Sequence, residues 1–322
     1  MSERVLVTGG AGFIGSHLCE EWLRRGAAVV ALDDLSRGRA ENLRGMLGQR
    51  GFEFVRGSAS DAALVEQVAS GVTRVFHLAA SVGVRGVCER PHDVIAADLA
   101  ATRVVGDVAL RLSLPLCFTS SSEVYGPLAE PPLAEDHGVV FANDSPRAAY
   151  AASKLAGEAL LVAAHRQHEH AIVIARLFNV VGPRQRGGHV LPEFVRAVLE
   201  RRALVVHGSG AQTRCFAHVR DVVRALADLA TEPRAIGRVV NVGSARELSI
   251  LELAGRVSAC AGAAERLEFR SHAQVYSARF TETRRRVPDL ARLEQLIGWV
   301  PAGFSDEWVT ELLDEHSVHR GS

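Results

Sequence analysis

The sequence predicts an α/β fold in which a doubly wound, parallel sheet is followed by a smaller C-terminal lobe. Over the first 120 residues, short β-branched runs alternate with helical patterns, and this alternation indicates βαβ crossovers. A glycine-rich turn, TGGAGFIG, follows the first of these runs. After Gly182-Pro183 the alternation gives way to loops rich in glycine and arginine, so we expect a second lobe there.

Each expected element follows from a local pattern. Strands are predicted where β-branched and other apolar residues cluster, at 5–8, 28–33, 52–56, 74–78, 114–119 and 171–177. Helical patterns lie between or after them, at 13–25, 39–50, 61–69, 91–112 and 148–168. The C-terminal part is expected to contain helices at 191–201 and 250–261, short strands at 204–206 and 239–242, and solvated loops at 127–132 and 284–286.

The composition argues against several classes of protein. The 37 basic and 37 acidic side chains balance, and the pI is near 7.2, whereas a dedicated binder of nucleic acid or membrane surfaces normally has a basic excess. The five cysteines show no CxxC spacing and the 13 histidines no HExxH pattern, so we expect free thiols and no metal site. With no apolar run near about 18 residues and no visible secretory leader, a cytoplasmic protein is expected.

The glycine-rich turn has the features of a dinucleotide site. Gly9, Gly12 and Gly15 have GxxGxxG spacing at the start of the helix expected at 13–25. Glycine lets the backbone approach a pyrophosphate, and the helix N-terminus supplies unpaired N–H groups. Asp33 ends the second strand, 18 residues after Gly15, where a carboxylate can accept hydrogen bonds from the adenosine ribose. Because this carboxylate would repel a 2′-phosphate, the sequence favours NAD over NADP.

Lysine is nearly absent from this chain. Lys154 is the one lysine among the 37 cationic side chains. It lies four residues after Tyr150, so the two side chains share a face of the expected helix. An ammonium about 4 Å from the phenol would lower the phenol pKa by about three units, which brings a tyrosinate within reach of neutral pH. The pair therefore indicates a general base and its electrostatic partner.

Taken together, these motifs resemble an extended short-chain dehydrogenase/reductase of the NDP-sugar epimerase, dehydratase and decarboxylase superfamily. The resemblance covers nearly the whole chain, in the segments TGGAGFIGSH, LDDLSRG, VFHLAA, SSSEVYG, YAASK, RLFNVVGPR, QTRCFAHVRD and RRVPDLARLEQLIGW. It implies a Rossmann-type NAD-binding domain at 1–178, to which a segment near 214–244 returns, and a substrate-binding lobe over most of 179–322. It also implies a homodimer that pairs through the helices expected at 91–112 and 148–168.

The same resemblance implies the catalytic and cofactor-binding residues. Tyr150 is the general base, Lys154 supports it, and Ser121 shares the hydrogen bond to the sugar 4-hydroxyl while C4 gives a hydride to NAD. The residues implied to contact NAD, besides the tyrosine and the lysine, are Gly9, Gly12, Phe13, Ile14, Gly15, Asp33, Ser36, Arg37, Leu78, Ala79 and Ala80. The chain departs from the family pattern at Ser58, usually acidic, and at Asp98, usually asparagine. Neither change is expected to touch the reacting centre.

The reaction that follows oxidation depends on Glu123. Sugar 4-epimerases tend to have a small residue here, and 4,6-dehydratases an Asp-Glu pair whose acid is replaced by Ser122. Serine followed by glutamate resembles the UDP-glucuronate decarboxylases, in which a 4-keto intermediate loses carbon dioxide and C5 is reprotonated. The segment SVGVR at 81–85 resembles 4-epimerases instead. A UDP-glucuronate decarboxylase giving UDP-xylose or a UDP-4-keto-pentose is therefore favoured, with a UDP-sugar 4-epimerase, then a dehydratase, as alternatives.

A catalytically idle NAD-binding sensor is the alternative outside enzymes, but the Ser-Tyr-Lys set is intact. Arginine forks suit both the diphosphate of a UDP-sugar and the carboxylate of a glucuronate. By resemblance, the residues expected to bind the substrate are Arg85, Ser122, Glu123, Asn179, Arg214 and Arg286. Arg284 or Arg285 could take the place of Arg286.

Overall fold

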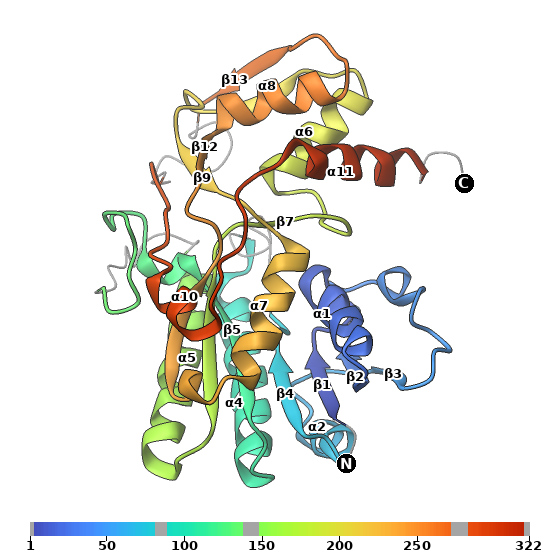
Figure 1. Ribbon diagram of the computed structural model, residues 1–322, viewed down its shortest axis with the longest axis vertical. Coiled ribbons are helices and arrows are strands. Elements are labelled where there is room, and N and C mark those ends of the chain that lie inside the picture. Colours follow the sequence, from blue (N-terminus) through green and yellow to red (C-terminus); the bar gives the residue numbers. More distant parts are fainter. Residues whose placement is uncertain (1–2, 81–88, 138–147, 272–282, 319–322) are drawn as a thin grey trace.

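The structure is a computed structural model that describes residues 3–80, 89–137, 148–271 and 283–318. Its centre is a parallel sheet of seven strands in the order β3-β2-β1-β4-β5-β6-β11 (Figure 1). The strands are β1 (Arg4–Thr8), β2 (Ala28–Asp33), β3 (Phe52–Arg56), β4 (Arg74–His77), β5 (Leu116–Ser121), β6 (Ile172–Leu177) and β11 (Arg238–Val242). The order reverses between β1 and β4, and ligands of such sheets bind outside the carboxyl ends of the strands at this point.

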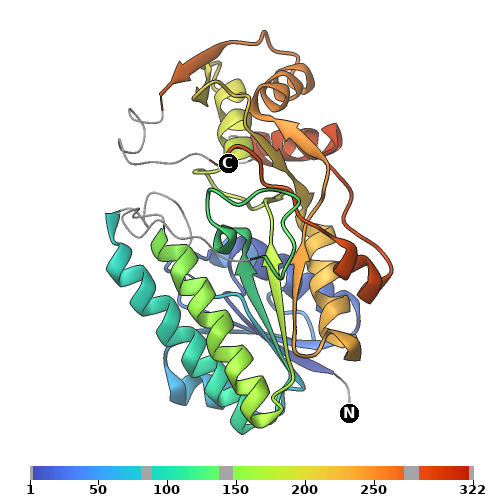
Figure 2. The ribbon, with the colours of Figure 1, turned by 90° about the vertical axis from the view of Figure 1, so that its left-hand side faces the viewer.

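Helices cover both faces of the sheet because alternate residues of each strand point to opposite sides. In β1, Val5 and Val7 belong to one hydrophobic core and Leu6 to the other. The first core is covered by α1 (Phe13–Arg24), α7 (Val219–Thr231) and α10 (Ala291–Ile297). The second is covered by α2 (Ala62–Ala69), α4 (Pro91–Arg111) and α5 (Ala148–His168), and the last two helices lie side by side in Figure 2.

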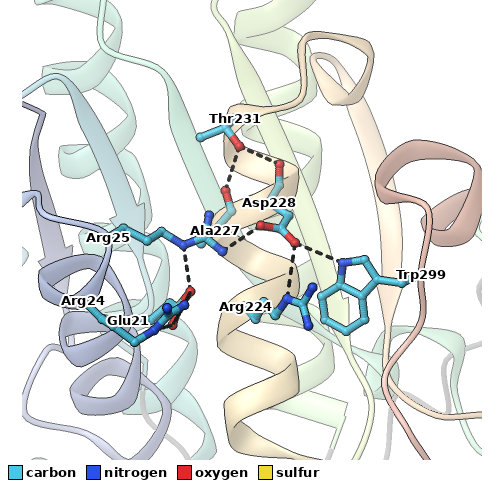
Figure 3. Close-up of polar contacts among 8 residues, drawn as sticks. All are labelled: Glu21, Arg24, Arg25, Arg224, Ala227, Asp228, Thr231 and Trp299. Carbon is cyan, nitrogen blue, oxygen red and sulfur yellow. Dashed lines mark hydrogen bonds and ion pairs between the residues drawn. The ribbon is translucent and has the colours of Figure 1, made fainter.

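A polar network joins α7 to α1 and to Trp299, which follows α10 (Figure 3). Asp228 accepts hydrogen bonds from Arg25 Nη2 at 2.7 Å and from Trp299 Nε1 at 3.0 Å. Arg25 also pairs with Glu21 at 2.7 Å, and the guanidinium of Arg224 lies 4.4 Å from the centre of the Trp299 ring. These contacts fix α7, which comes late in the chain, against the first helix.

The C-terminal lobe lies beyond the carboxyl ends of the sheet strands (Figure 1). Its core is formed by α6 (Val190–Leu199), α8 (Ile250–Cys260) and α11 (Asp306–Val318). Three pairs of short strands complete it: β7 (Val180–Val181) with β10 (Ala217–His218), β9 (Thr213–Cys215) with β12 (Glu247–Ser249), and β8 (Leu204–His207) with β13 (Leu267–Arg270). The lobe therefore stands above the edge at which the sheet can bind a ligand.

The structure confirms the α/β class and the parallel sheet, and β11 is the strand expected at 239–242. The helix expected at 39–50 is wrong, because only a short 3₁₀ helix, η1 (Ala40–Leu43), forms there. Two glycines weaken that segment as a helix, and one of them, Gly48, has a φ of +82°. Two further 3₁₀ helices are η2 (Ser122–Tyr125) and η3 (Pro233–Ala235). Within the described ranges, no helix is long and apolar enough to cross a membrane.

Candidate active site

The glycine turn between β1 and α1 is packed so closely that it has no room for side chains. A Cβ on Gly15 would lie 2.1 Å from the carbonyl oxygen of Gly9. Gly9 has a φ of +71°, and a Cβ there would lie 2.8 Å from the backbone nitrogen of Ala79, just after β4. Gly12 caps α1. The backbone and the first N–H groups of α1 can thus approach a ligand, which fits a pyrophosphate.

Asp33 holds the turn in place as well as ending β2. Its side chain is almost buried, and its two oxygens accept hydrogen bonds from the backbone nitrogens of Ala11 at 3.0 Å and Leu35 at 2.8 Å. Burial raises the pKa of this carboxyl, and the two backbone hydrogen bonds act in the opposite direction. A carboxylate has about four acceptor positions, so two remain for ribose hydroxyls. The residue therefore fits the predicted NAD contact.

The other residues expected to contact NAD lie at the same edge of the sheet. Phe13 and Ile14 begin α1, Ser36 and Arg37 are exposed after β2, and residues 78–80 follow β4. The segment after β4 is held against β1, because the Ala79 nitrogen donates to Oγ1 of Thr8 at 3.3 Å. Their contacts with NAD remain a prediction.

Tyr150 and Lys154 lie near the start of α5, beside the end of β5. Lys154 is 4% exposed, and its Nζ donates to the carbonyl oxygen of Thr119 at 2.9 Å. The ammonium lies 4.8 Å from the centre of the Phe118 ring and 5.9 Å from that of Tyr150. The half-buried phenol of Tyr150 forms a hydrogen bond with the side chain of Ser121. The three residues predicted to carry out the oxidation are therefore close together.

The electrostatics of Tyr150 differ from the expectation. Burial raises the pKa of its phenol, the carboxylates of Asp98 and Glu123 raise it further, and only the hydrogen bond with Ser121 lowers it. Sequence analysis predicted that Lys154 brings the pKa of Tyr150 close to neutral. This prediction is wrong for the protein without bound ligands, because burial and the two carboxylates raise the pKa. Burial removes water from the ammonium of Lys154 and so disfavours its charged form, which lowers the pKa of Lys154 to about 8.

Asp98, which stands where the family usually has asparagine, affects the pKa values of Tyr150 and Lys154. The expectation that this change does not touch the reacting centre is therefore wrong. Asp98 is buried on α4, and its Oδ2 accepts a hydrogen bond from Oγ of Ser153 at 3.0 Å. Ser153 precedes the lysine, and Asp98 raises the pKa values of both Tyr150 and Lys154. The helix contact between α4 and α5 thus brings a negative charge close to the dyad.

Glu123 pairs with an arginine from far along the chain. It lies in η2, directly after β5, and its Oε1 accepts a hydrogen bond from Nη1 of Arg286 at 2.5 Å. Arg286 is 4% exposed, its Nη2 donates to Oγ1 of Thr283 at 3.1 Å, and its Nε has no partner in the part of the chain that the structure describes. Residues 284–286 form a loop, as expected, but the guanidinium of Arg286 is buried against a carboxylate and not solvated.

Arg214 and Arg286 meet at Thr283, a residue that the sequence did not single out. Nη1 of Arg214 donates to the carbonyl oxygen of Thr283 at 2.9 Å, and Arg286 bonds its hydroxyl. A threonine between two separated motifs carries no sequence signal of this kind. Two of the three predicted substrate arginines therefore lie in one region, whereas Arg285 pairs with Glu247 at the surface.

The remaining predicted substrate residues are distributed as follows. Asn179 lies just before β7, and its Nδ2 donates to the carbonyl oxygen of Cys215 at 3.4 Å, next to Arg214. Ser122 is buried at the start of η2. Arg85 and the rest of the segment 81–85 lie outside the described residues.

Curated relatives and solved structures resemble this chain over nearly its whole length. A decarboxylase of UDP-N-acetyl-α-D-glucosaminuronate from Bacillus cytotoxicus is 34% identical over 94% of both chains. UDP-glucuronic acid decarboxylase 1 from Xenopus tropicalis is 31% identical over 93% of this chain and 68% of its own length.

Among solved structures, the UDP-glucuronic acid 4-epimerase of Bacillus cereus, in complex with UDP-glucuronic acid and NAD, superposes with a TM-score of 0.88. It is 26% identical, and the match covers 98% of this chain and 99% of that one. Residues 5–243 also match the model of the NAD dependent epimerase/dehydratase family. The tight glycine turn, the Tyr-Lys helix and this match agree, and the chain therefore belongs to the NAD-dependent epimerase/dehydratase family.

Proposed function

We propose that this protein decarboxylates a UDP-linked hexuronic acid, with UDP-glucuronate as the first candidate. The observation that carries the proposal is the pair between the half-buried Glu123 and the buried Arg286, beside Tyr150. An epimerase only has to rotate a ketone, whereas a decarboxylase has to bind a carboxylate and return a proton to carbon. The two decarboxylases at 34% and 31% identity support the same reading.

NAD is the cofactor of the family, and the residues of this chain fit it. The glycine turn would hold the pyrophosphate, Asp33 the adenosine ribose, and Tyr150 with Lys154 the nicotinamide end. When bound, NAD supplies the acceptor for the hydride that leaves C4 of the sugar. The remaining chemistry falls to the side chains of the protein.

Oxidation at C4 begins with proton transfer in the proposed mechanism. Tyr150 removes the proton of the 4-hydroxyl, and Ser121 holds that hydroxyl through a shared hydrogen bond. The phenol of Tyr150 has a raised pKa, so the phenolate needs a nearby positive charge. Lys154 supplies that charge from the next turn of α5.

Decarboxylation follows because the C6 carboxylate is then β to a ketone. The C5–C6 bond breaks, carbon dioxide leaves, and the electron pair passes to the C4 carbonyl as an enolate, which is protonated at C5. Arg286, whose Nε has no partner among the described residues, is suited to bind the carboxylate. Glu123 orients the water or hydroxyl that gives C5 its proton.

Mass spectrometry of the sugar nucleotide tests this proposal. Purified protein is incubated with NAD and UDP-glucuronate, and in parallel with UDP-N-acetylglucosaminuronate. We expect loss of carbon dioxide from one of them. Unchanged mass with altered chromatographic mobility would indicate the 4-epimerase, which the likeness to the Bacillus cereus structure favours as second candidate. Loss of water would indicate a dehydratase, and an inert protein would favour the NAD-binding sensor.

We further propose that two copies pair through α4 and α5. These helices lie side by side (Figure 2), and α5 has an exposed apolar side chain, Leu160, which is 38% exposed. Sedimentation at micromolar concentration tests this, since a monomer would contradict it. A cytoplasmic location and the division into a cofactor domain at 1–178 and a substrate lobe at 179–322 also remain proposals.

A further inference from the structure

One face of α5 is connected to β5 at successive strand residues. Lys154 and Glu158 are one helical turn apart, so they lie on the same face as Tyr150. Nζ of Lys154 donates to the carbonyl oxygen of Thr119 at 2.9 Å, and the carboxylate of Glu158 accepts from Oγ of Ser120 at 2.5 Å. The phenol of Tyr150 bonds the next residue of the strand. Contacts at successive residues fix both the rotation and the height of the helix over the strand.

Glu158 also binds the neighbouring strand. Nε and Nη2 of Arg176 on β6 donate to its two oxygens at 2.9 and 2.7 Å. Ser120 and Arg176 are direct partners in the pairing of β5 with β6, so the carboxylate spans both strands. The side chains of Glu158 and Arg176 are only 5% and 6% exposed. Removing one partner of such a pair leaves a buried charge without compensation.

The guanidinium of Arg176 is held on its other sides too. It lies 4.8 Å from the centre of the Tyr125 ring, and its Nη1 donates to the carbonyl oxygen of Glu135 at 3.2 Å. It therefore cannot turn away from Glu158 without breaking further contacts. The carboxylate keeps its place because its partner is fixed.

We propose that Glu158 is a positioning residue that sets both the place and the charge of Lys154 beside Tyr150. Neither the sequence motifs nor the family match assigns Glu158 a role. The inference rests on the proposed roles of Lys154 and Tyr150 in the oxidation step. The role of Glu158 is the same whichever product forms after the oxidation step.

The groups around Lys154 explain why its charge needs support. Burial lowers the pKa of the ammonium, while Asp98 on α4 and Glu158 on α5 raise it, and the balance is a pKa of about 8. A group with this pKa is partly neutral at the pH of a cell. A change of one neighbouring charge would therefore alter how much of the protein carries the ammonium.

Among the described residues, Asp98 and Glu158 are the only carboxylates that shift the pKa of Lys154. His77 on β4 is buried, and its pKa is lowered to about 3, so its ring is neutral. Tyr150 on α5 stays a neutral phenol until its proton is removed. Arg176 on β6 is positive and is compensated only by Glu158 among the contacts described here. Loss of Glu158 would thus remove one negative charge near Lys154 and leave the positive charge of Arg176 without its partner.

The single lysine of the chain makes the test direct. Protein labelled with carbon-13 at lysine Cε, without lysine in any tag, gives one side-chain signal whose shift titrates with Lys154. We expect Glu158→Gln to lower this pKa by about one unit and Arg176→Gln to raise it. Asp228→Asn, which weakens another ion pair between elements, is the control and should leave it unchanged. An unmoved pKa in Glu158→Gln, or equal shifts in both variants, would overturn the proposal.

Turnover separates this inference from the proposed function. With the substrate that the wild type uses, kcat of Glu158→Gln should fall about 5-fold at about pH 8 with little change in KM, because a pKa lowered from about 8 to about 7 reduces the charged fraction of Lys154 from about one half to about one tenth. Its activity should decline at lower pH than in the wild type. Glu158→Asp keeps the charge but shortens the side chain, so kcat should fall while the pH profile stays in place. Should Glu158→Gln not fold, the Asp and Arg176→Gln variants still carry the test. If the wild type is inactive with every uronate, the proposed function fails, whereas the lysine titration still tests the inference.

Discussion

Nη1 of Arg286 lies 2.5 Å from Oε1 of Glu123, and 163 residues separate the two in the chain. The contact joins η2, which follows β5 directly, to the segment between β13 and α10. Arg286 keeps one buried donor without a partner in the described structure. A buried cation with a spare donor, beside a carboxylate and a tyrosine, is suited to a substrate that itself has a carboxylate.

Replacing Glu123 should separate oxidation from decarboxylation. In Glu123→Ala we expect reduction of bound NAD, seen by its near-ultraviolet absorbance, to persist while carbon dioxide release is lost. Glu123→Gln keeps the shape and the hydrogen bond but not the charge, so it should behave in the same way if the charge is what matters. Turnover equal to that of the wild type in both variants would rule out the proposed role.

Arg286→Lys keeps a positive charge but loses the planar fork. We expect kcat/KM for the uronate to fall by about 10- to 100-fold, since a hydrogen bond to a charged group contributes roughly 1.5–3 kcal/mol. Arg285→Lys is the matched control, because that guanidinium pairs with Glu247 at the surface and should be dispensable. Steady-state kinetics decide between them, and equal losses in both variants would contradict the assignment of Arg286.

The sequence predicted those parts of the molecule whose signals are local. Val5 and Val7 alternate with Leu6 in a short β-branched run, and the glycines after it need close backbone approach, so β1 and its turn were recognised. The family resemblance singled out Arg286, but its burial and its pairing with Glu123 could not be predicted, because the partner is distant and arginine is common in this chain. Tyr150 was found but its pKa was misjudged, since burial and a carboxylate from another helix are tertiary effects. Glu158 could have been found, because it continues the four-residue spacing of Tyr150 and Lys154.

Burial of Lys154 should make stability depend on pH. The folded pKa of about 8 is below the ordinary value of 10.5, so the unfolded chain binds the proton more tightly. This group therefore destabilises the fold below about pH 8, and the penalty disappears as pH rises toward 10.5. Relative to Lys154→Met, the wild type should gain about 2.5 kcal/mol between pH 7 and 10. Urea unfolding of both proteins measures this, and a difference that does not change with pH would contradict the assigned pKa.

Asp33→Asn should weaken cofactor binding and reduce the preference for NAD over NADP. The amide would place a donor against the backbone N–H of Ala11 or Leu35, and it would remove the charge that repels a 2′-phosphate. We expect the Kd for NAD to rise at least about 10-fold, because a hydrogen bond from the ribose to a charged carboxylate contributes roughly 1.5–3 kcal/mol. Asp34→Asn changes the net charge equally at an exposed neighbour and serves as control. Calorimetric titration with both dinucleotides reads the result, and a wild type that prefers NADP would refute the role of Asp33.

Asp228 should matter for stability and not for catalysis, because it joins α7 to α1 and to Trp299, and none of its contacts within the described ranges involves Tyr150 or Lys154 (Figure 3). Its side chain is 27% exposed, so the ion pair with Arg25 is partly screened. Asp228→Ala should lower the free energy of unfolding by about 1–2 kcal/mol, with kcat unchanged. Trp299→Phe removes only the indole donor and keeps the ring beside Arg224, so it should cost about 1 kcal/mol. Thermal unfolding measures both, and added salt should reduce the loss in Asp228→Ala but not in Trp299→Phe, because only the first variant removes a charge. Losses that respond equally to salt would mean that the ion pair is not what holds α7 against α1.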